Sequence, residues 1–99
     1  MLFLSREGSL PDTVIRKYLI RLDAGLHVRT ALTIAKLAEK FKSRLFIGKD
    51  GEEIAFDSPL GLLTLGISKG DEISVRINGP DSLELARAFD KLVDDNFGE

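Results

Sequence analysis

Four stretches of the chain have the pattern of hydrophobic and polar positions that is typical of β-strands. VIRKYLIRL (14–22) is rich in β-branched and aromatic residues, and EISVRIN (72–78) alternates between polar and apolar positions. SRLFIG (43–48) and EEIAF (52–56) flank the turn sequence KDGE, whose glycine accepts a positive φ. We therefore predict four strands, of which the middle two form a hairpin.

A helical pattern begins at Val28 and continues to about Phe41. Its polar residues Lys36, Glu39 and Lys40 fall outside the apolar stripe. The apolar positions at helical spacing are Ala31, Ile34, Ala35, Leu37, Ala38 and Phe41. This spacing predicts an amphipathic helix with one face towards the core.

A second, shorter helix is predicted in DSPLGLLTLG (57–66). Ser58 is suited to cap its free N–H groups, and Pro59 fits the first helical position because no amide donor is needed there. Gly66 can close the far end in a left-handed conformation. The purely structural interpretation of Ser58 is therefore a helix cap.

A last helix follows the turn NGPD, and Asp81 with Glu84 is expected to form its capping box. Its apolar face consists of Leu85, Ala86, Phe89, Leu92 and Val93. The element order is then β-α-β-β-α-β-α, which predicts an α+β two-layer open-faced sandwich with helices over one face of the sheet. Residues 1–12 precede the first strand and are expected to form a flexible N-terminal extension; 13–99 form one domain.

Composition excludes several kinds of chemistry. The chain has no cysteine and one histidine, so we expect no metal site and no disulfide. No apolar run approaches the roughly 20 residues that cross a bilayer, and no signal peptide is recognisable, which favours a cytoplasmic protein without membrane insertion.

Charge is unevenly distributed along the chain. Residues 1–49 hold ten Lys/Arg against four Asp/Glu, whereas residues 50–99 hold four against twelve. The imbalance indicates either a basic face for an acidic partner or ordinary solvated surfaces. The net charge of −2, and the lack of a dense basic run, argue against nucleic-acid binding.

The single histidine, His27, lies in AGLHVRTAL (24–32), where a loop becomes the first predicted helix. Unpaired N–H groups and the macrodipole at a helix N-terminus favour a bound anion and a neutral imidazole, whose free lone pair is nucleophilic. Arg29 adds a guanidinium shaped for phosphoryl oxygens. We therefore interpret His27 as an acceptor of a phosphoryl group; the alternative is an inert surface histidine. No serine–histidine–carboxylate spacing, glycine-rich phosphate loop or cofactor motif is recognisable.

Four segments together resemble HPr, the histidine-containing phosphocarrier of the bacterial sugar phosphotransferase system. They are GLHVRTA, DSPLGLLTLG, KGDEISVRINGPD and the ending NFGE, and the similarity runs from about residue 14 to the end. The resemblance implies an antiparallel four-stranded sheet in the order 1-4-2-3, covered on one face by three helices. It also implies a monomeric carrier rather than a turnover catalyst.

By position, the resemblance assigns roles to several residues. His27 would be phosphorylated by Enzyme I at the expense of phosphoenolpyruvate and would pass the group to an Enzyme II A component, with Arg29 flanking the site. Ser58 would be the serine that a kinase modifies, and a phosphorylase restores, to recruit a transcription regulator. The docking surface for partner proteins would include Leu26, Leu60 and Leu63.

The chain departs from the family pattern around both the histidine and the serine. Val28 and Leu32 stand where the family has small residues, and Thr30 replaces a proline. Because proline fixes φ at a helix start, its loss is expected to loosen the turn that presents the histidine, and the larger side chains are expected to dry the site and change partner fit.

Beside Ser58, Asp57 replaces a basic residue and Pro59 replaces a large aliphatic one. A carboxylate beside an incoming phosphate is electrostatically unfavourable. Two functions therefore stay open: a phosphocarrier acting through the histidine, and an HPr-fold regulatory module that acts through Ser58 and its apolar surroundings without phosphotransfer.

Overall fold

The computed structural model describes residues 12–99. The N-terminal extension expected over 1–12 therefore lies outside the described residues, except for Asp12. Within the described chain the elements are β1 (Thr13–Leu19), α1 (Val28–Ala38), β2 (Arg44–Lys49), β3 (Glu52–Ala55), α2 (Pro59–Leu63), β4 (Glu72–Asn78), α3 (Ser82–Asp94) and the 3-10 turn η1 (Asn96–Gly98). The predicted order of strands and helices is confirmed.

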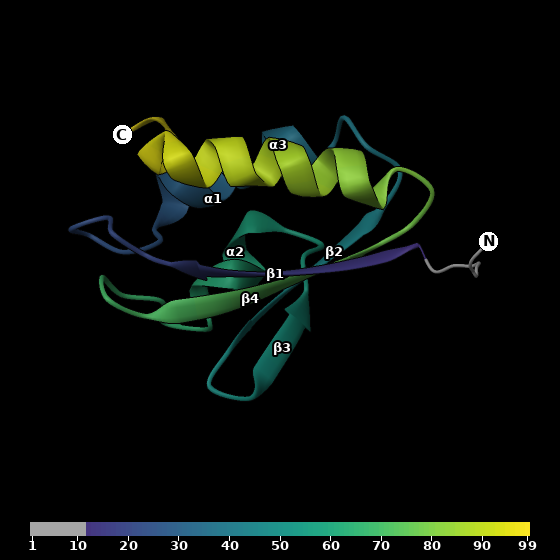
Figure 1. The fold of residues 1–99 in the computed structure, drawn as a ribbon. Helices are drawn as coiled ribbons and strands as arrows, with labels where there is room; N and C mark the ends of the chain where they lie inside the picture. The colour runs from purple at the N-terminus through teal and green to yellow at the C-terminus, as the bar shows by residue number, and fades with distance from the viewer. Residues whose placement is uncertain (1–11) are drawn as a thin grey trace.

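The four strands form one antiparallel sheet in the order β1-β4-β2-β3. β2 and β3 pair as the predicted hairpin, with Ile47 opposite Ile54. In β4 the alternation turns Ile73, Val75 and Ile77 inward, and all three are fully buried. Figure 1 shows α1 and α3 lying over one face of the sheet, so that the sandwich is open on the other face.

The inner faces of the helices complete the core as their spacing predicts. Ala31 and Ile34 of α1 and Leu85, Ala86 and Phe89 of α3 are fully buried, while Leu92 and Val93 are partly buried against them. The Phe89 ring stacks on Tyr18 of β1, with 5.3 Å between ring centroids. The stacked rings pack α3 against β1 within this core.

Several elements are shorter than predicted. β1 ends at Leu19 rather than 22, α1 ends at Ala38 rather than near 41, and α2 spans only five residues. The punctuation of α2 is as predicted: Ser58 accepts a hydrogen bond from the amide of Gly61, and Gly66 has φ of 61°. No helix in residues 12–99 is long and apolar enough to cross a membrane.

The capping box expected at the start of α3 is wrong. Asp81 occupies the N-cap position, but its side chain makes no capping hydrogen bond. Its carboxylate instead accepts hydrogen bonds from the amides of Lys42 and Ser43, both at 2.9 Å, and from the Ser43 hydroxyl. A contact across 38 residues of sequence thus replaces the local cap, and it ties the α1–β2 loop to the start of α3.

Candidate functional site

The loop that leads to His27 is pressed against the segment before β4. Gly25 has φ of 67°, a left-handed conformation, and a Cβ there would lie 2.3 Å from the carbonyl oxygen of Ile67. The amide of Leu26 donates to that same carbonyl at 3.1 Å, and the Leu26 side chain is buried in the core. This close approach determines where the next residue, His27, leaves the body of the domain.

His27 is the N-cap of α1, in extended conformation, and its side chain is 31% exposed. Its Nδ1 accepts a hydrogen bond from the backbone amide of Arg29 at 3.2 Å. The nitrogen that accepts must hold a lone pair, so in a neutral ring the proton is on Nε2. The reactive lone pair of the imidazole therefore faces the amide groups at the start of the helix, where an anion is stabilised.

Thr30 holds the His27 backbone from inside the protein. The His27 amide donates to Thr30 Oγ1 at 2.9 Å, and the Thr30 hydroxyl donates to the His27 carbonyl at 3.0 Å. The Thr30 side chain is fully buried. These hydrogen bonds of Thr30 act on the same turn that proline would stiffen, and they oppose the loosening expected from its loss.

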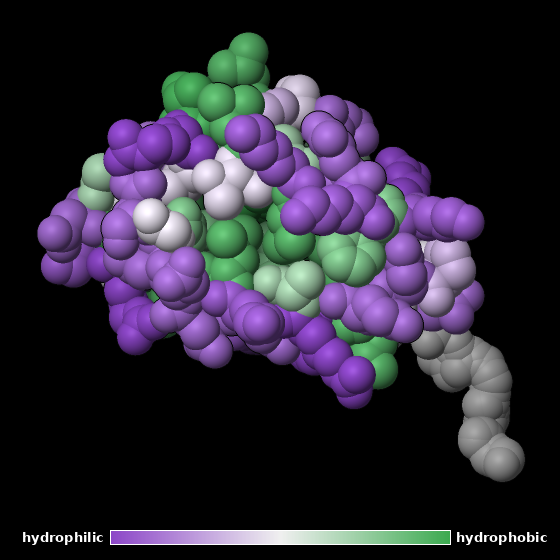
Figure 2. Space-filling model, turned by 90° about the horizontal axis from the view of Figure 1, so that it is seen from above, coloured by the Kyte–Doolittle hydropathy of each residue, from purple (hydrophilic) through white to green (hydrophobic). Residues whose placement is uncertain are grey.

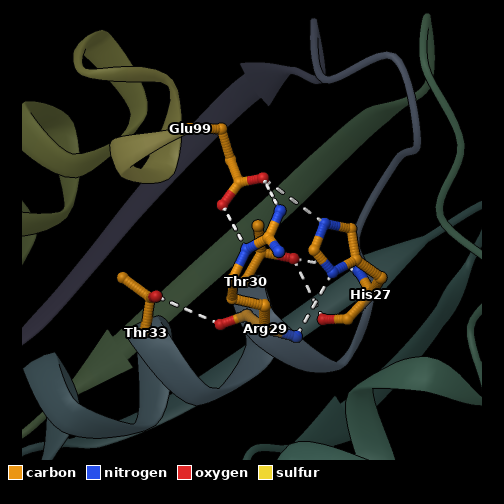
Figure 3. A network of polar contacts seen from close by, with 5 residues as sticks. All are labelled: His27, Arg29, Thr30, Thr33 and Glu99. Carbon is orange, nitrogen blue, oxygen red and sulfur yellow. Dashed lines mark hydrogen bonds and ion pairs between the residues drawn. The ribbon is translucent and has the colours of Figure 1, made fainter.

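The acidic side chain of Glu99 lies against His27 and Arg29, as Figure 3 shows. One carboxylate oxygen, Oε2, accepts from Arg29 Nε at 2.8 Å, and the other, Oε1, pairs with Arg29 Nη2 and lies 3.7 Å from His27 Nε2. The pairing lowers the pKa of Glu99 and raises that of Arg29, in both cases chiefly through their hydrogen bonds. At neutral pH a carboxylate therefore lies between the Arg29 guanidinium and the Nε2 edge of the His27 ring.

The turn η1 brings Glu99 to this place. Phe97 is buried with φ of 58°, its ring meets that of Phe89 edge to face at 6.5 Å, and the chain then reverses towards α1. A cavity of about 330 Å³ between η1 and the loop before α1 has His27, Arg29 and Glu99 on its wall. Glu99 is the site residue that our sequence reasoning missed, because it is 72 positions from the histidine and only the buried Phe97 hints that the C-terminal segment folds back.

The structure separates the other predicted residues from this centre. Ser58 is an exposed helix cap on α2, away from the His27 cavity. Leu60 is 69% exposed, as a residue of a docking surface must be, whereas Leu63 is partly buried. The assignment of Leu26 to that surface is corrected: it is only 8% exposed because it packs into the core beneath the histidine loop.

A sheet of this order, covered by helices on one face and presenting a half-exposed histidine at a helix N-cap, defines the class of histidine phosphocarriers. The family model described as PTS HPr component phosphorylation site matches residues 14–95. The chain therefore belongs to the HPr family, whose members are phosphocarrier proteins rather than turnover catalysts.

Similar proteins cover most of the chain. The phosphocarrier protein HPr of Neisseria meningitidis is 33% identical over 75 residues, which cover 76% of this chain and 84% of that protein. The HPr-like protein Crh of Bacillus subtilis is 35% identical over 79 residues, covering 80% and 89%. The crystal structure of HPr-C-His from Thermoanaerobacter tengcongensis superposes with a TM-score of 0.81 at 30% identity, covering 87% of this chain and 97% of that one.

Proposed function

We propose that this protein is a cytoplasmic, monomeric phosphocarrier that accepts a phosphoryl group on His27 from phosphorylated Enzyme I and passes it to an Enzyme II A component of the phosphotransferase system. The observation that carries the proposal is the direction of the His27 Nδ1 lone pair, which faces the first amides of α1 beside Arg29. Membership of the HPr family supports the same chemistry.

In the proposed transfer, the lone pair of His27 Nδ1 attacks phosphorus in line with the leaving nitrogen of the donor's phosphohistidine. The Nδ1–P bond forms, the donor N–P bond breaks, and its electron pair returns to the donor ring. The proton on Nε2 stays in place. The Arg29 amide donates to Nδ1 before the transfer and is then free to donate to a phosphoryl oxygen. Other amides at the helix N-terminus stabilise the developing charge.

Glu99 must yield its position during this step. Its carboxylate is held by the Arg29 guanidinium at the place where a phosphoryl group on His27 needs a cation. Two anions cannot share one guanidinium without repulsion, so the incoming group competes with Glu99 for Arg29. The phosphoryl group carries more negative charge than the carboxylate that it displaces, which favours it in the competition for the guanidinium.

Partner proteins are proposed to dock on the α1–α2 face, with Leu60 and Leu63 among the contact residues. Ser58 lies on this face as an exposed cap, its Oγ accepting one hydrogen bond of 3.3 Å from Gly61. A serine kinase with its phosphorylase, and a transcription regulator, are the partners proposed for Ser58. A regulatory module that uses Ser58 alone is the second candidate function, and the exposed hydroxyl is the observation that favours it.

Incubation with phosphoenolpyruvate and Enzyme I of the same organism tests the proposal. We expect one acid-labile, alkali-stable phosphate on His27, and no label on His27→Ala. Ser58→Ala is the control that should label like the wild type. Label that persists on His27→Ala would refute the mechanism. A wild-type protein that gains no label here, but gains an acid-stable phosphate in a parallel incubation with a serine kinase and ATP, would favour the regulatory module.

Arg29→Ala should slow phosphoryl acceptance by roughly 10²-fold, because it removes one preorganised cation from the developing charge. The fold should be retained, since the Arg29 side chain is 71% exposed. Stopped-flow or quench kinetics at saturating Enzyme I measure the effect. An unchanged rate would mean that Arg29 is a solvated bystander.

A further inference from the structure

The α1–α2 face, which begins at His27, carries large apolar side chains that the histidine chemistry does not use. Val28 and Leu32, one helical turn apart on α1, are 52% and 47% exposed, and Leu60 of α2 is 69% exposed. Most of the surface in Figure 2 is hydrophilic, and hydrophobic side chains emerge only in limited groups. Exposed apolar groups next to a reactive residue are typical of a protein–protein contact.

Two exposed carboxylates lie where α1 ends and α2 begins, at the far end of this face from His27. Glu39, at the C-cap of α1, and Asp57, just before α2, are both exposed and border a cavity of about 390 Å³ that also has Ala35, Ala38 and Pro59 on its wall. Within residues 12–99 neither carboxylate takes part in a salt bridge. The cavity therefore has acidic groups at its rim and apolar carbon on its wall, which suits the stem and charge of a lysine or arginine.

Within the described part of the chain, the cations around this cavity form no salt bridge with its carboxylates. Arg44 also borders it, but its guanidinium lies 5.1 Å from the centroid of the Phe46 ring on the open face of the sheet. Lys36 and Lys40 project from the exposed side of α1 and do not line the cavity. The partner-facing surface thus passes from the Arg29–Glu99 pair, through an apolar centre, to an acidic end.

From these observations we infer that the phosphotransfer partner, which contacts the apolar side chains of this face, also carries a basic side chain that enters the cavity between Glu39 and Asp57. The inference rests on the proposed function and specifies its partner. Glu39 lies 12 residues after His27, so at 1.5 Å per residue the basic group sits roughly 18 Å from the reacting histidine on the partner. Two contacts so far apart fix the orientation of docking as well as its strength.

The test is the steady-state KM for phosphoryl acceptance from Enzyme I of the same organism, with phosphoenolpyruvate in excess. Reversing both charges, Glu39→Lys with Asp57→Lys, should raise KM about tenfold at low salt and leave kcat unchanged. The difference should shrink at 0.5 M salt, because the Debye length falls below the roughly 10 Å of 0.1 M salt. The control is Glu52→Lys, a charge reversal on the β2–β3 hairpin, for which we expect wild-type KM.

The apolar half is tested in the same assay. Val28→Ala with Leu32→Ala should raise KM about tenfold at every salt concentration, against Leu83→Ala, which truncates an exposed leucine of α3. If the charge reversal lowers KM or matches its control, the basic partner group is refuted; if the alanine pair matches its control, the apolar contact is refuted. A wild-type protein that accepts no phosphoryl group refutes the proposed function instead.

Discussion

Replacing Thr30 with valine tests how the chain restrains His27 without the proline that the family has at this position. Valine matches the shape of the buried threonine but removes the hydroxyl, so that two hydrogen bonds to the His27 backbone disappear. The His27 carbonyl keeps a partner, because it also accepts from the amide of Ala31 at 2.8 Å. The His27 amide is left without a partner in the described structure.

The cost follows from that one orphaned donor. Loss of a capping interaction and of a hydrogen bond to a part-buried amide destabilises a protein by roughly 1–2 kcal/mol. For a domain of this size such a loss lowers Tm by about 5–15 °C. Thermal unfolding followed by circular dichroism, with urea unfolding as a check, measures both quantities.

Thr33→Val is the matched control. Its hydroxyl donates to the Arg29 carbonyl at 3.1 Å on the surface of the same helix, so its loss strands no amide, and we expect a change within about 0.5 kcal/mol. A Thr30→Val protein as stable as Thr33→Val would refute the claim that the threonine hydroxyl replaces the restraint of proline.

Two further predictions concern the loop at Gly25 and the side chain of Glu99. Gly25→Ala should destabilise by more than about 2 kcal/mol, since it adds a clash with the Ile67 carbonyl to the left-handed φ; Gly51→Ala, also left-handed but with open space, should lose only about 1 kcal/mol in urea unfolding. If both variants lose the same free energy of unfolding, the loop at Gly25 moves to relieve the clash and the reasoning is refuted. Glu99→Gln should accept phosphoryl groups several-fold faster at low salt, because Arg29 is then unpaired, and a slower rate would contradict competition. Because the pKa of Glu99 is lowered in the folded state, its pairing stabilises the fold fully above the ordinary carboxyl pKa of about 4.3. This stabilisation is lost as pH falls from there through the lowered pKa, which an NMR titration of the side chain measures.

Local pattern was sufficient for most of the fold because its signals act over a few residues. The alternation Ile73, Val75, Ile77 predicted the inward face of β4, and the caps Ser58 and Gly66 bracketed α2. The predicted ends of the strands and helices were less accurate. Apolar residues such as Ile20 continue past the end of β1, because they enter the core from a loop. The sheet order followed from the family resemblance rather than from periodicity.

By itself, the sequence determined the local setting of His27: a single histidine before a helix, with an arginine two positions on, needs only local geometry to face the helix amides. Only the tertiary structure decided what surrounds it. Glu99 reaches Arg29 because Phe97 is buried against Phe89. The Asp81 carboxylate binds amides of the α1–β2 loop instead of capping α3. These polar contacts of Glu99 and Asp81 join residues 38 to 70 positions apart, and they form only once the packing of the core brings the residues together.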